Sequence, residues 1–379
     1  MRIMISCGEP SGDLYAGALA AALRARAPAA EIVGFGGRRL EAAGASLVGD
    51  FTGLTVTGLT EALRVLPRSY AMLRTLVGAA RARRPDVFVA IDFPDFNFRL
   101  MAALRRLGIP VVYYVSPQLW AWRPGRLKTM QRLVDRMLVI FPFEAPIYER
   151  AGVPVQFVGH PLVDLARPAR PRAAVLRELG LHPDAPTVAL LPGSRPNELR
   201  RIGPVMAAAL PAIRDAVPGV QFVVARAPNL PDVLFASFAG CAGVEDATDD
   251  VLAAADLVIT ASGTATVQTA LHERPMVVVY RVSSLSYRVG KPLLKVDTYA
   301  MPNLVAGRRI VPELIQDDCT PERIASEAVA LLSDPDASAR MREALRTLRE
   351  QLGAPGASGR AADAVLQVAA RASDGATPA

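Results

Sequence analysis

Apolar runs of strand length alternate with stretches of helical spacing along the whole chain. In the first half the expected strands are residues 2–7, 32–35, 87–91, 111–115, 137–141 and 155–158. Their apolar residues are continuous rather than alternating, which is typical of strands buried on both faces of a parallel sheet. Helical patterns lie between them, at residues 14–23, 97–107 and 128–135. This order predicts a doubly wound α/β domain.

The same rhythm restarts after a Pro- and Arg-rich stretch, residues 164–172, which is typical of a linker. Further strands are expected at residues 187–191, 221–224, 257–260 and 276–280, and helices dominate after residue 320. We therefore predict an α/β protein with two doubly wound, Rossmann-like domains that face each other across a cleft. The expected domains are residues 1–164 and 165–345, followed by a C-terminal helix and frayed tail at 346–379.

Length and composition agree with this organisation. A chain of 379 residues with 51% hydrophobic and 21% charged residues suits two folded domains and gives no reason to expect disorder. The longest uncharged runs, 107–122 and 257–272, are shorter than the about 20 residues of a membrane-spanning helix. No secretory signal is expected either. Cys7, Cys241 and Cys319 are too few and too far apart for a disulfide scaffold or a cysteine zinc site, so we expect a cytosolic protein.

The net charge of +7 is unevenly distributed. Residues 1–170 hold 22 Lys and Arg against 13 Asp and Glu, a balance of +9, whereas the rest of the chain has a balance of −2. A basic first half favours contact with an anionic partner, which is a phospholipid surface, a nucleic acid or a phosphorylated substrate. The alternative is an arginine-rich composition spread over the surface.

Several common chemistries lack their motifs. Gly290-Lys291 is followed by Pro292, so no Walker phosphate loop is present, and no Gly-x-Gly-x-x-Gly follows the first strand. No Gly-x-Ser-x-Gly elbow and no His-Glu-x-x-His pair occur, so no metal site is expected.

The first candidate site is Gly8-Glu-Pro-Ser-Gly-Asp13, between the first strand and a helix. Loops at the carboxyl ends of parallel strands form the ligand crevice of such sheets. Glu9 would offer a carboxylate there. The alternative is a tight turn in which Asp13 is the N-cap of the following helix.

The second candidate site is Ile91-Asp-Phe-Pro-Asp-Phe-Asn97, also at the end of a buried strand. Desolvation among aromatic side chains raises the pKa of a carboxyl group and makes it a better proton acceptor. Asp92, nearest the strand, is the candidate base, whereas Asp95 or Asn97 better suits a helix cap. Glu9 and Asp95 remain alternatives for the base.

Two further turns lie at strand ends in the second half: 192–195, which ends in Arg195, and Ser262-Gly263-Thr264. Small residues at a helix start leave backbone N–H groups for a phosphate, and an arginine adds a bidentate donor. Two such turns in one domain predict a site for a nucleotide diphosphate, although each alone is typical of ordinary helix caps.

Residues 59–77 form a basic amphipathic stretch. Its apolar residues recur at helical spacing beside Arg64, Arg68 and Arg74. Such a stretch can lie in a bilayer interface, and the alternative is an ordinary helix that buries its apolar side. Pro67 favours two short helices over one.

Taken together, the motifs resemble the lipid-A-disaccharide synthase family of GT-B glycosyltransferases, from residue 2 to about residue 352. Besides the segments 8–13 and 91–97, the motifs that carry the resemblance are Tyr114-Val-Ser-Pro-Gln-Leu-Trp-Ala-Trp-Arg123, Phe141-Pro-Phe-Glu144, Gly159-His-Pro161, Leu190-Leu-Pro-Gly-Ser-Arg195, Ala261-Ser-Gly-Thr-Ala265 and Pro302-Asn-Leu-Val-Ala-Gly307.

The resemblance implies that UDP-2,3-diacylglucosamine is the donor and 2,3-diacylglucosamine 1-phosphate the acceptor. The products are then the β-1,6-linked disaccharide 1-phosphate and UDP, formed by an inverting displacement without metal or cofactor. The resemblance further implies that Asp92 is the base and that Glu9 and Asn303 are important for activity. It places the UDP phosphates at Arg195, Ser262, Gly263 and Thr264. Gln268 stands where the class usually has a ribose-binding glutamate.

With this resemblance, residues 1–164 are expected to be the acceptor domain and 165–345 the UDP-sugar domain. The basic segment 59–77 would then bind the cytoplasmic leaflet of the inner membrane, so we expect a peripheral, cytoplasmic enzyme that binds no nucleic acid. A homodimer is allowed. The alternatives are another UDP-sugar-dependent GT-B transferase, a UDP-sugar epimerase, and a nucleotide-sensing membrane adaptor without catalysis.

Overall fold

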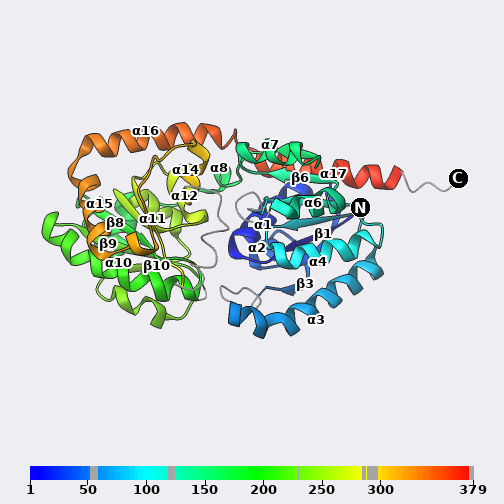
Figure 1. Ribbon diagram of the computed structural model, residues 1–379, viewed down its shortest axis with the longest axis horizontal. Helices are drawn as coiled ribbons and strands as arrows, with labels where there is room; N and C mark the ends of the chain where they lie inside the picture. Colours follow the sequence, from blue (N-terminus) through cyan, green and yellow to red (C-terminus); the bar gives the residue numbers. More distant parts are fainter. Residues whose placement is uncertain (52–58, 118–123, 229, 284–286, 288–297, 375–379) are drawn as a thin grey trace. The chain divides into compact units, whose positions relative to one another are not determined.

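Both halves of the chain fold as parallel sheets covered by helices on each face, so the prediction of two doubly wound α/β domains is confirmed (Figure 1). The computed structural model describes residues 1–51, 59–117, 124–228, 230–283, 287 and 298–374. Unit 1 comprises residues 1–161 and 352–379, and unit 2 comprises residues 162–351. The chain thus changes unit a few residues from the expected boundaries after 164 and 345. The roles expected for the domains stay predictions.

Unit 1 contains a seven-stranded sheet in the order β3-β2-β1-β4-β5-β6-β7. Every neighbouring pair is parallel. The central strands are continuous buried apolar runs, as a sheet covered on both faces requires. The strands are β1 (Arg2–Cys7), β2 (Glu31–Gly36), β3 (Ser46–Asp50), β4 (Val87–Ile91), β5 (Val111–Tyr114), β6 (Arg136–Val139) and β7 (Val155–Phe157).

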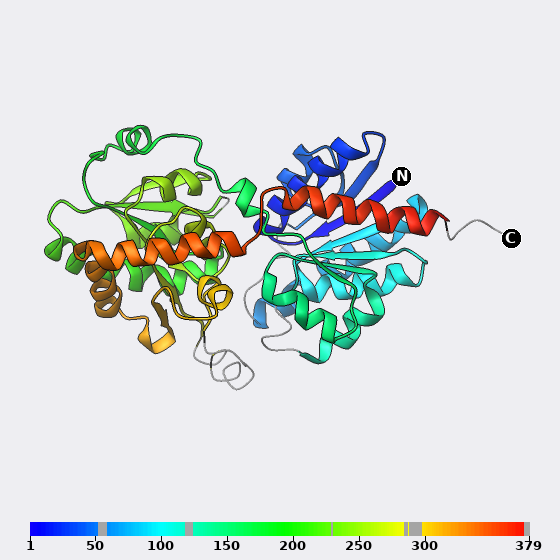
Figure 2. The same cartoon turned by 90° about the horizontal axis from the view of Figure 1, so that it is seen from above.

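Two groups of helices cover this sheet. Helices α1 (Pro10–Arg26), α2 (Arg38–Ala42) and α17 (Ala357–Asp374) pack together, and Figure 2 shows α17, in red, lying across the strands beside α1. Helices α3 (Leu59–Arg83), α4 (Pro94–Arg105) and α6 (Leu127–Leu133) pack in succession, and α7 (Ala145–Arg150) follows β6. Buried side chains such as Phe88, Met101 and Tyr113 form the core beneath the second group.

The expectation of two short helices around Pro67 is wrong, because α3 is one helix that contains Pro67. A proline in a helix removes one backbone hydrogen bond and strains the preceding turn. Packing of the helix on the sheet offsets that cost. Leu76 and Ala80 are fully buried, and Met72, Leu73 and Val77 also pack against the core.

Unit 2 contains a six-stranded parallel sheet in the order β10-β9-β8-β11-β12-β13. Its strands are β8 (Thr187–Leu191), β9 (Gln221–Arg226), β10 (Ala242–Glu245), β11 (Leu257–Ala261), β12 (Met276–Tyr280) and β13 (Glu313–Ile315). Its helices are α8 (Leu162–Leu165), α9 (Arg172–Glu178), α10 (Pro196–Ala216), α11 (Thr248–Ala254), α12 (Thr264–Leu271), α14 (Met301–Ala306), α15 (Pro321–Ser333) and α16 (Pro335–Gln351). Helix α10 packs with α15, whereas α12, α14 and α16 pack together.

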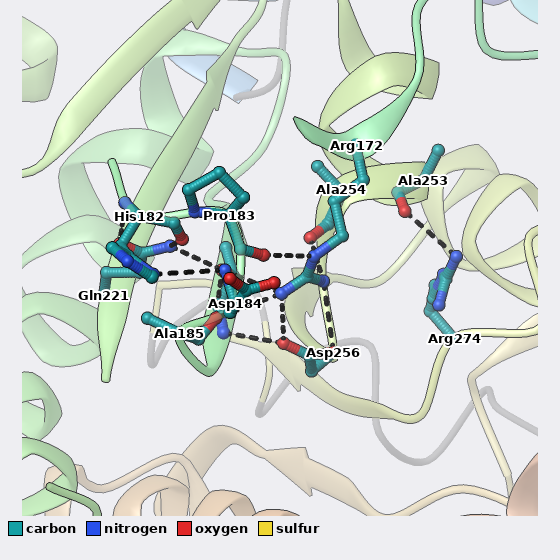
Figure 3. Close-up of polar contacts among 11 residues, drawn as sticks. Arg172, His182, Pro183, Asp184, Ala185, Gln221, Ala253, Ala254, Asp256 and Arg274 are labelled. Atoms are coloured by element: carbon teal, nitrogen blue, oxygen red, sulfur yellow. Dashed lines mark hydrogen bonds and ion pairs between the residues drawn. The ribbon is translucent and has the colours of Figure 1, made fainter. Parts of the chain in front are cut away.

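The Pro- and Arg-rich stretch at 164–172 is anchored to unit 2 by Arg172 (Figure 3). The Arg172 guanidinium pairs with Asp256, which also accepts the Thr187 backbone N–H at 2.8 Å. Further bonds from Arg172 go to the carbonyls of Pro183, Ala185 and Ala254. Asp256 precedes β11 and Thr187 begins β8, so this cluster joins the starts of these two strands. Their other ends lead into the turns at 192–195 and 262–264, where the sequence predicts phosphate binding and which we call the phosphate-type turns.

Candidate active site

In unit 1 the two acidic motifs leave the sheet side by side. Strands β1 and β4 are neighbours at the point where the strand order reverses, and Cys7 pairs with Ile91 at their ends. The turns that follow, Gly8-Glu9 and Asp92-Phe93, therefore start next to each other. Open α/β sheets bind ligands at this kind of position. The structure thus brings together the turns that carry Glu9 and Asp92, two of the predicted site residues.

The β4–α4 turn has an unusual backbone. Asp92 and Phe93 both have positive φ angles, 47° and 49°, which is uncommon for residues other than glycine. Strain of this kind persists only where the surroundings enforce it. The Phe93 ring stacks on the Phe96 ring, with the two ring centroids 5.3 Å apart. It also covers Gly8, where an added Cβ would lie 2.1 Å from the Phe93 ring. Gly8 is therefore required for the two turns to pack together.

Asp13 does not cap its own helix, so that alternative interpretation of the first motif is wrong. It lies inside α1 and is 5% exposed. Its carboxylate accepts the backbone N–H groups of Gly37, Arg39 and Leu40 at 2.7–3.2 Å, which caps the start of α2. Glu9 is the half-buried residue before α1. The motif thus combines the capping carboxylate of Asp13 with the carboxylate of Glu9 near the carboxyl end of β1.

The other acidic and nucleophilic groups at this edge have different surroundings. Asp95 is exposed and forms an ion pair with Arg126 at 2.8 Å. Burial, together with the charges of Asp13 and Asp92, raises the pKa of the Cys7 thiol, which disfavours the thiolate at neutral pH. Asp92 is half-buried and lies directly at the strand end. Of the two carboxylates in the second motif, Asp92 therefore better suits proton transfer.

Unit 2 has a comparable edge, by which we mean the carboxyl ends of its strands. There β8 and β11 end as neighbours, with Leu191 paired to Thr260. The turn 192–195 leads into α10, and Ser262-Gly263 leads into α12, whose first residue is Thr264. Gly193 and Gly263 have φ angles of 125° and 141°, conformations that favour glycine. Arg195 and Ser262, Gly263 and Thr264 are thus brought to one edge, where two helix N-termini supply N–H donors.

Glu198 is a residue of this edge that the sequence analysis missed. Its carboxylate accepts the Ser194 backbone N–H and pairs with the Arg195 guanidinium, both at 3.0 Å. The side chain is 15% exposed and packs against Gly193. Glu198 therefore holds the Ser194 N–H in the turn and orients the Arg195 guanidinium. An acidic residue in the first turn of a helix is the sequence signal that indicates such a role.

Gln268 lies one turn after Thr264 on α12, and its amide donates to Asp249 at 2.8 Å. Asp249, in the first turn of α11, also contacts the His272 ring at 2.7 Å. Residues four apart share one face of a helix, so Thr264 and Gln268 lie on one face of α12, followed by His272 just after its end. Asp249 thus sets the orientation of the Gln268 amide.

Asn303 is buried, with 1% exposure, and its amide is fully engaged within unit 2. The NH2 group donates to the Val311 carbonyl and to Glu313, and the oxygen accepts the backbone N–H groups of Ile310 and Val311. These four bonds are all that a carboxamide normally forms. The structure therefore places Asn303 as a support of α14 rather than in the turns with Arg195 and Ser262.

Trp120, Trp122 and Arg123 lie outside the described residues, and so do the side chains of Leu59 and Leu63. Among the described residues, no cluster of three or more His, Cys, Asp or Glu residues is placed to hold a metal. In the described part of the chain, no helix has the length and apolar character needed to cross a bilayer. Leu66 and Tyr70 of α3 are exposed, at 44% and 60%.

Comparison with known proteins identifies relatives along almost the entire chain. The family model described as lipid-A-disaccharide synthetase matches residues 3–368. The lipid-A-disaccharide synthase of Myxococcus xanthus is 46% identical over 373 residues, with 97% of each chain covered. That of Geobacter metallireducens is 44% identical over 375 residues, again with 97% of each chain covered.

Solved structures share the fold at lower identity. UDP-GlcNAc 2-epimerase from Neisseria meningitidis, bound to UDP-GlcNAc, aligns with a TM-score of 0.69 at 13% identity and covers 97% of this chain and 100% of that one. The calicheamicin glycosyltransferase CalG4 aligns with a TM-score of 0.60 at 19% identity, with 98% of each chain covered. These likenesses confirm the predicted GT-B fold class.

Proposed function

Because this chain belongs to the lipid-A-disaccharide synthase family, we propose that it joins UDP-2,3-diacylglucosamine to 2,3-diacylglucosamine 1-phosphate. The products are the β-1,6-linked disaccharide 1-phosphate and UDP. Family membership makes the chain a glycosyltransferase of lipid A biosynthesis. The observation that carries the finer proposal is that both sheets end in turns suited to this reaction, carboxylates in unit 1 and phosphate-type turns in unit 2.

The donor diphosphate is assigned to the edge of β8 and β11. Arg195 supplies a guanidinium, and Ser262, Gly263 and Thr264 supply hydroxyl and backbone donors at the start of α12. Such preorganised donors stabilise the charge that develops on a leaving diphosphate. They support departure of UDP without a divalent metal. Gln268, oriented by Asp249, is assigned to the ribose, because its amide oxygen can accept hydrogen bonds from the ribose hydroxyls.

The acceptor is assigned to the edge of β1 and β4. In the proposed step the Asp92 carboxylate removes the proton of the acceptor 6-hydroxyl, and that oxygen attacks the anomeric carbon of the donor. The bond from that carbon to UDP breaks on the opposite face, which inverts the configuration. Glu9, on the neighbouring turn, binds or orients the acceptor. Asn303 contributes indirectly, since its amide is engaged in holding α14.

Membrane contact is assigned to α3 and its basic surroundings. Leu66 and Tyr70 are exposed on the helix, near Arg68 and Arg74 in sequence. Exposed apolar side chains beside arginines suit the interface of an anionic bilayer. We therefore propose a cytoplasmic enzyme attached to the inner leaflet of the inner membrane, with residues 1–164 as the acceptor domain and 165–345 as the UDP-sugar domain. Association as a homodimer is compatible with this role.

The deciding experiment is an assay of disaccharide formation by the purified protein, in detergent with EDTA. The substrates are UDP-2,3-diacylglucosamine and 2,3-diacylglucosamine 1-phosphate, with UDP-N-acetylglucosamine as a parallel donor. Disaccharide formation with the diacylated donor but not with UDP-N-acetylglucosamine would support the proposed reaction, the requirement for acyl chains and the independence of added metal. Turnover only with the unacylated donor would indicate another UDP-sugar enzyme and overturn the proposal.

A further inference from the structure

A buried amide joins the two turns of the acceptor edge. Asn97, in the first turns of α4, is completely buried. Its NH2 group donates to the Asp92 carbonyl at 2.7 Å and to the Ile91 carbonyl at 3.3 Å. Its oxygen accepts the Ser6 hydroxyl of β1 at 2.8 Å. Asn97 therefore connects the end of β4 to the strand that leads into the Glu9 turn.

The Asp92 carbonyl has a second donor, the Tyr113 hydroxyl of β5, at 2.9 Å. Burial raises the pKa of Tyr113 well above its ordinary value, so this hydroxyl stays protonated and donates. Two hydrogen bonds to one carbonyl oxygen fix the rotation of the peptide after Asp92. Because φ of Asp92 is 47°, in a region that costs about 1–3 kcal/mol, the turn needs such enforcement.

Fixing this peptide also fixes the direction of the Cα–Cβ bond of Asp92, from which the carboxylate extends. The Asn97 and Tyr113 groups in these contacts are buried and bond to backbone or to Ser6. Asn97 and Tyr113 can therefore influence the reaction through the conformation of Asp92.

We propose that Asn97, together with Tyr113, is a positioning residue for transfer: it holds Asp92 in its left-handed conformation so that the carboxylate meets the acceptor hydroxyl. This inference rests on the proposed function, in which Asp92 is the base. It assigns to Asn97 an effect on the rate of transfer rather than on the binding of either substrate.

The first test compares kcat and KM for Asn97→Ala and Tyr113→Phe. A base displaced by about 1 Å can lose up to about a hundredfold in rate. We expect kcat of Asn97→Ala to fall by about tenfold to a hundredfold, with both KM values within about threefold of the wild type. Tyr113→Phe keeps the ring and should lose less, about threefold to tenfold. It also tests the proposal if Asn97→Ala does not fold.

The control is Asp135→Ala. Asp135 accepts the backbone N–H of Val111 at 2.7 Å and forms an ion pair with Arg105. Val111 begins β5, so this contact lies at the amino-terminal ends of the strands, opposite to the candidate site. Its loss should lower the melting temperature and leave kcat unchanged at a temperature well below melting. If Asn97→Ala and Asp135→Ala reduce kcat alike, in proportion to their stability, the role of Asn97 is merely structural and the proposal is wrong.

The second test combines Asn97→Ala with Asp92→Asn. Residues that act through one group are not additive, so in the Asp92→Asn background the loss of Asn97 should cost less than about twofold. A full additional loss would show that Asn97 acts by another route. A wild-type protein without disaccharide activity would overturn the proposed function and this role with it. An active wild type with unchanged kcat in Asn97→Ala and in Tyr113→Phe would overturn the positioning role alone.

Discussion

At the scale of single residues, Arg195 offers the clearest test of the donor edge. Its guanidinium is one-third exposed and is oriented by Glu198. A hydrogen bond to a charged group contributes about 1.5–3 kcal/mol, which corresponds to about tenfold to a hundredfold in binding. We expect Arg195→Ala to reduce kcat/KM for the UDP donor by this factor, measured by disaccharide formation at varied donor concentration.

The matched control is Arg200→Ala, an exposed arginine on the same helix whose bond is to Asn197. This variant should retain kcat/KM within about twofold, since an exposed side-chain contact of this kind contributes little. Equal losses in the two variants would contradict a specific role for Arg195.

Several residues of the candidate site could be predicted because they lie in turns that follow buried strands. Asp92 and Ser262 come directly after β4 and β11, and Arg195 lies four residues after the end of β8.

Asn97 fits only a helix cap in the sequence, because its partners, the Asp92 carbonyl and the Ser6 hydroxyl, come together only after folding. The sequence analysis misses Glu198 although Ser194 and Arg195 are its near neighbours, because an acidic residue in a first helical turn is common without such a role. The importance of Asn303 for activity stays a prediction from its motif, because its amide is bonded to the backbone of residues 310 and 311 and to the Glu313 side chain.

At the scale of elements, the contact between the Gly8 turn and the Phe93 turn predicts a sharp effect of one methyl group. A Cβ at Gly8 would lie 2.1 Å from the Phe93 ring, so the ring and the strained turn must move. We expect Gly8→Ala to reduce the free energy of unfolding by about 1–3 kcal/mol, as overpacking does. The same shift should reduce kcat by more than about tenfold, because it displaces Asp92.

The control for this change is Gly78→Ala, in α3, where an added Cβ meets no atom within 4 Å. Alanine favours a helix over glycine by about 1 kcal/mol, so this variant should be slightly stabilised and fully active. Urea unfolding and the disaccharide assay check both. A neutral Gly8→Ala variant would show that the two turns are not coupled through Phe93.

The exposed apolar residues of α3 predict vesicle binding. We expect Leu66→Ser combined with Tyr70→Ser to lower the vesicle partition coefficient on anionic phospholipid by at least about tenfold. Full burial of an apolar side chain contributes about 1.5–3 kcal/mol, and these two side chains are already partly buried in the free protein. Co-sedimentation measures this coefficient. Leu107→Ser, at a side chain of unit 1 that is 38% exposed, serves as the control. Equal binding of both variants would argue against α3 as the membrane contact.

Strands were predictable where both faces are buried. The expected bounds of β1, β4, β8 and β12 are confirmed, because these strands are continuous apolar runs. Strands β3, β10 and β13 lie at sheet edges and carry few fully buried side chains, so they lack that pattern and were not predicted. Tertiary packing likewise decided that α3 continues through Pro67.

At the scale of the whole molecule, the sequence analysis separates a C-terminal helix but does not predict that the chain returns to unit 1. The His160 backbone N–H donates to the Leu352 carbonyl at 2.8 Å, and the Arg360 side chain donates to the carbonyls of Val158 and Ala354. Segments about 200 residues apart are thus joined within unit 1. The Pro- and Arg-rich stretch indicated the first change of unit. The second lies at the short Gly- and Pro-containing segment 352–356 between α16 and α17, which marks a turn but does not show that the chain returns to the first sheet.

His160, in this joining region, makes the stability of the molecule depend on pH. The side chain is 2% exposed and its ring contacts Tyr15 and Phe141. Burial lowers the pKa of His160 from 6.5 to about 3. Between these values the unfolded chain binds a proton that the folded chain does not, so stability falls as the pH decreases below 6.5 and this loss ends near pH 3. The slope approaches about 1.4 kcal/mol per pH unit.

We therefore expect the wild type to lose about 2 kcal/mol of unfolding free energy through this group between pH 7.5 and pH 5. His160→Gln should lack that part of the pH dependence, although it lowers stability at pH 7.5. Urea unfolding at the two pH values measures the difference for each variant, and exposed His182→Gln is the control, which should follow the wild type. Parallel pH dependences in the wild type and His160→Gln would show that His160 is not buried in its neutral form.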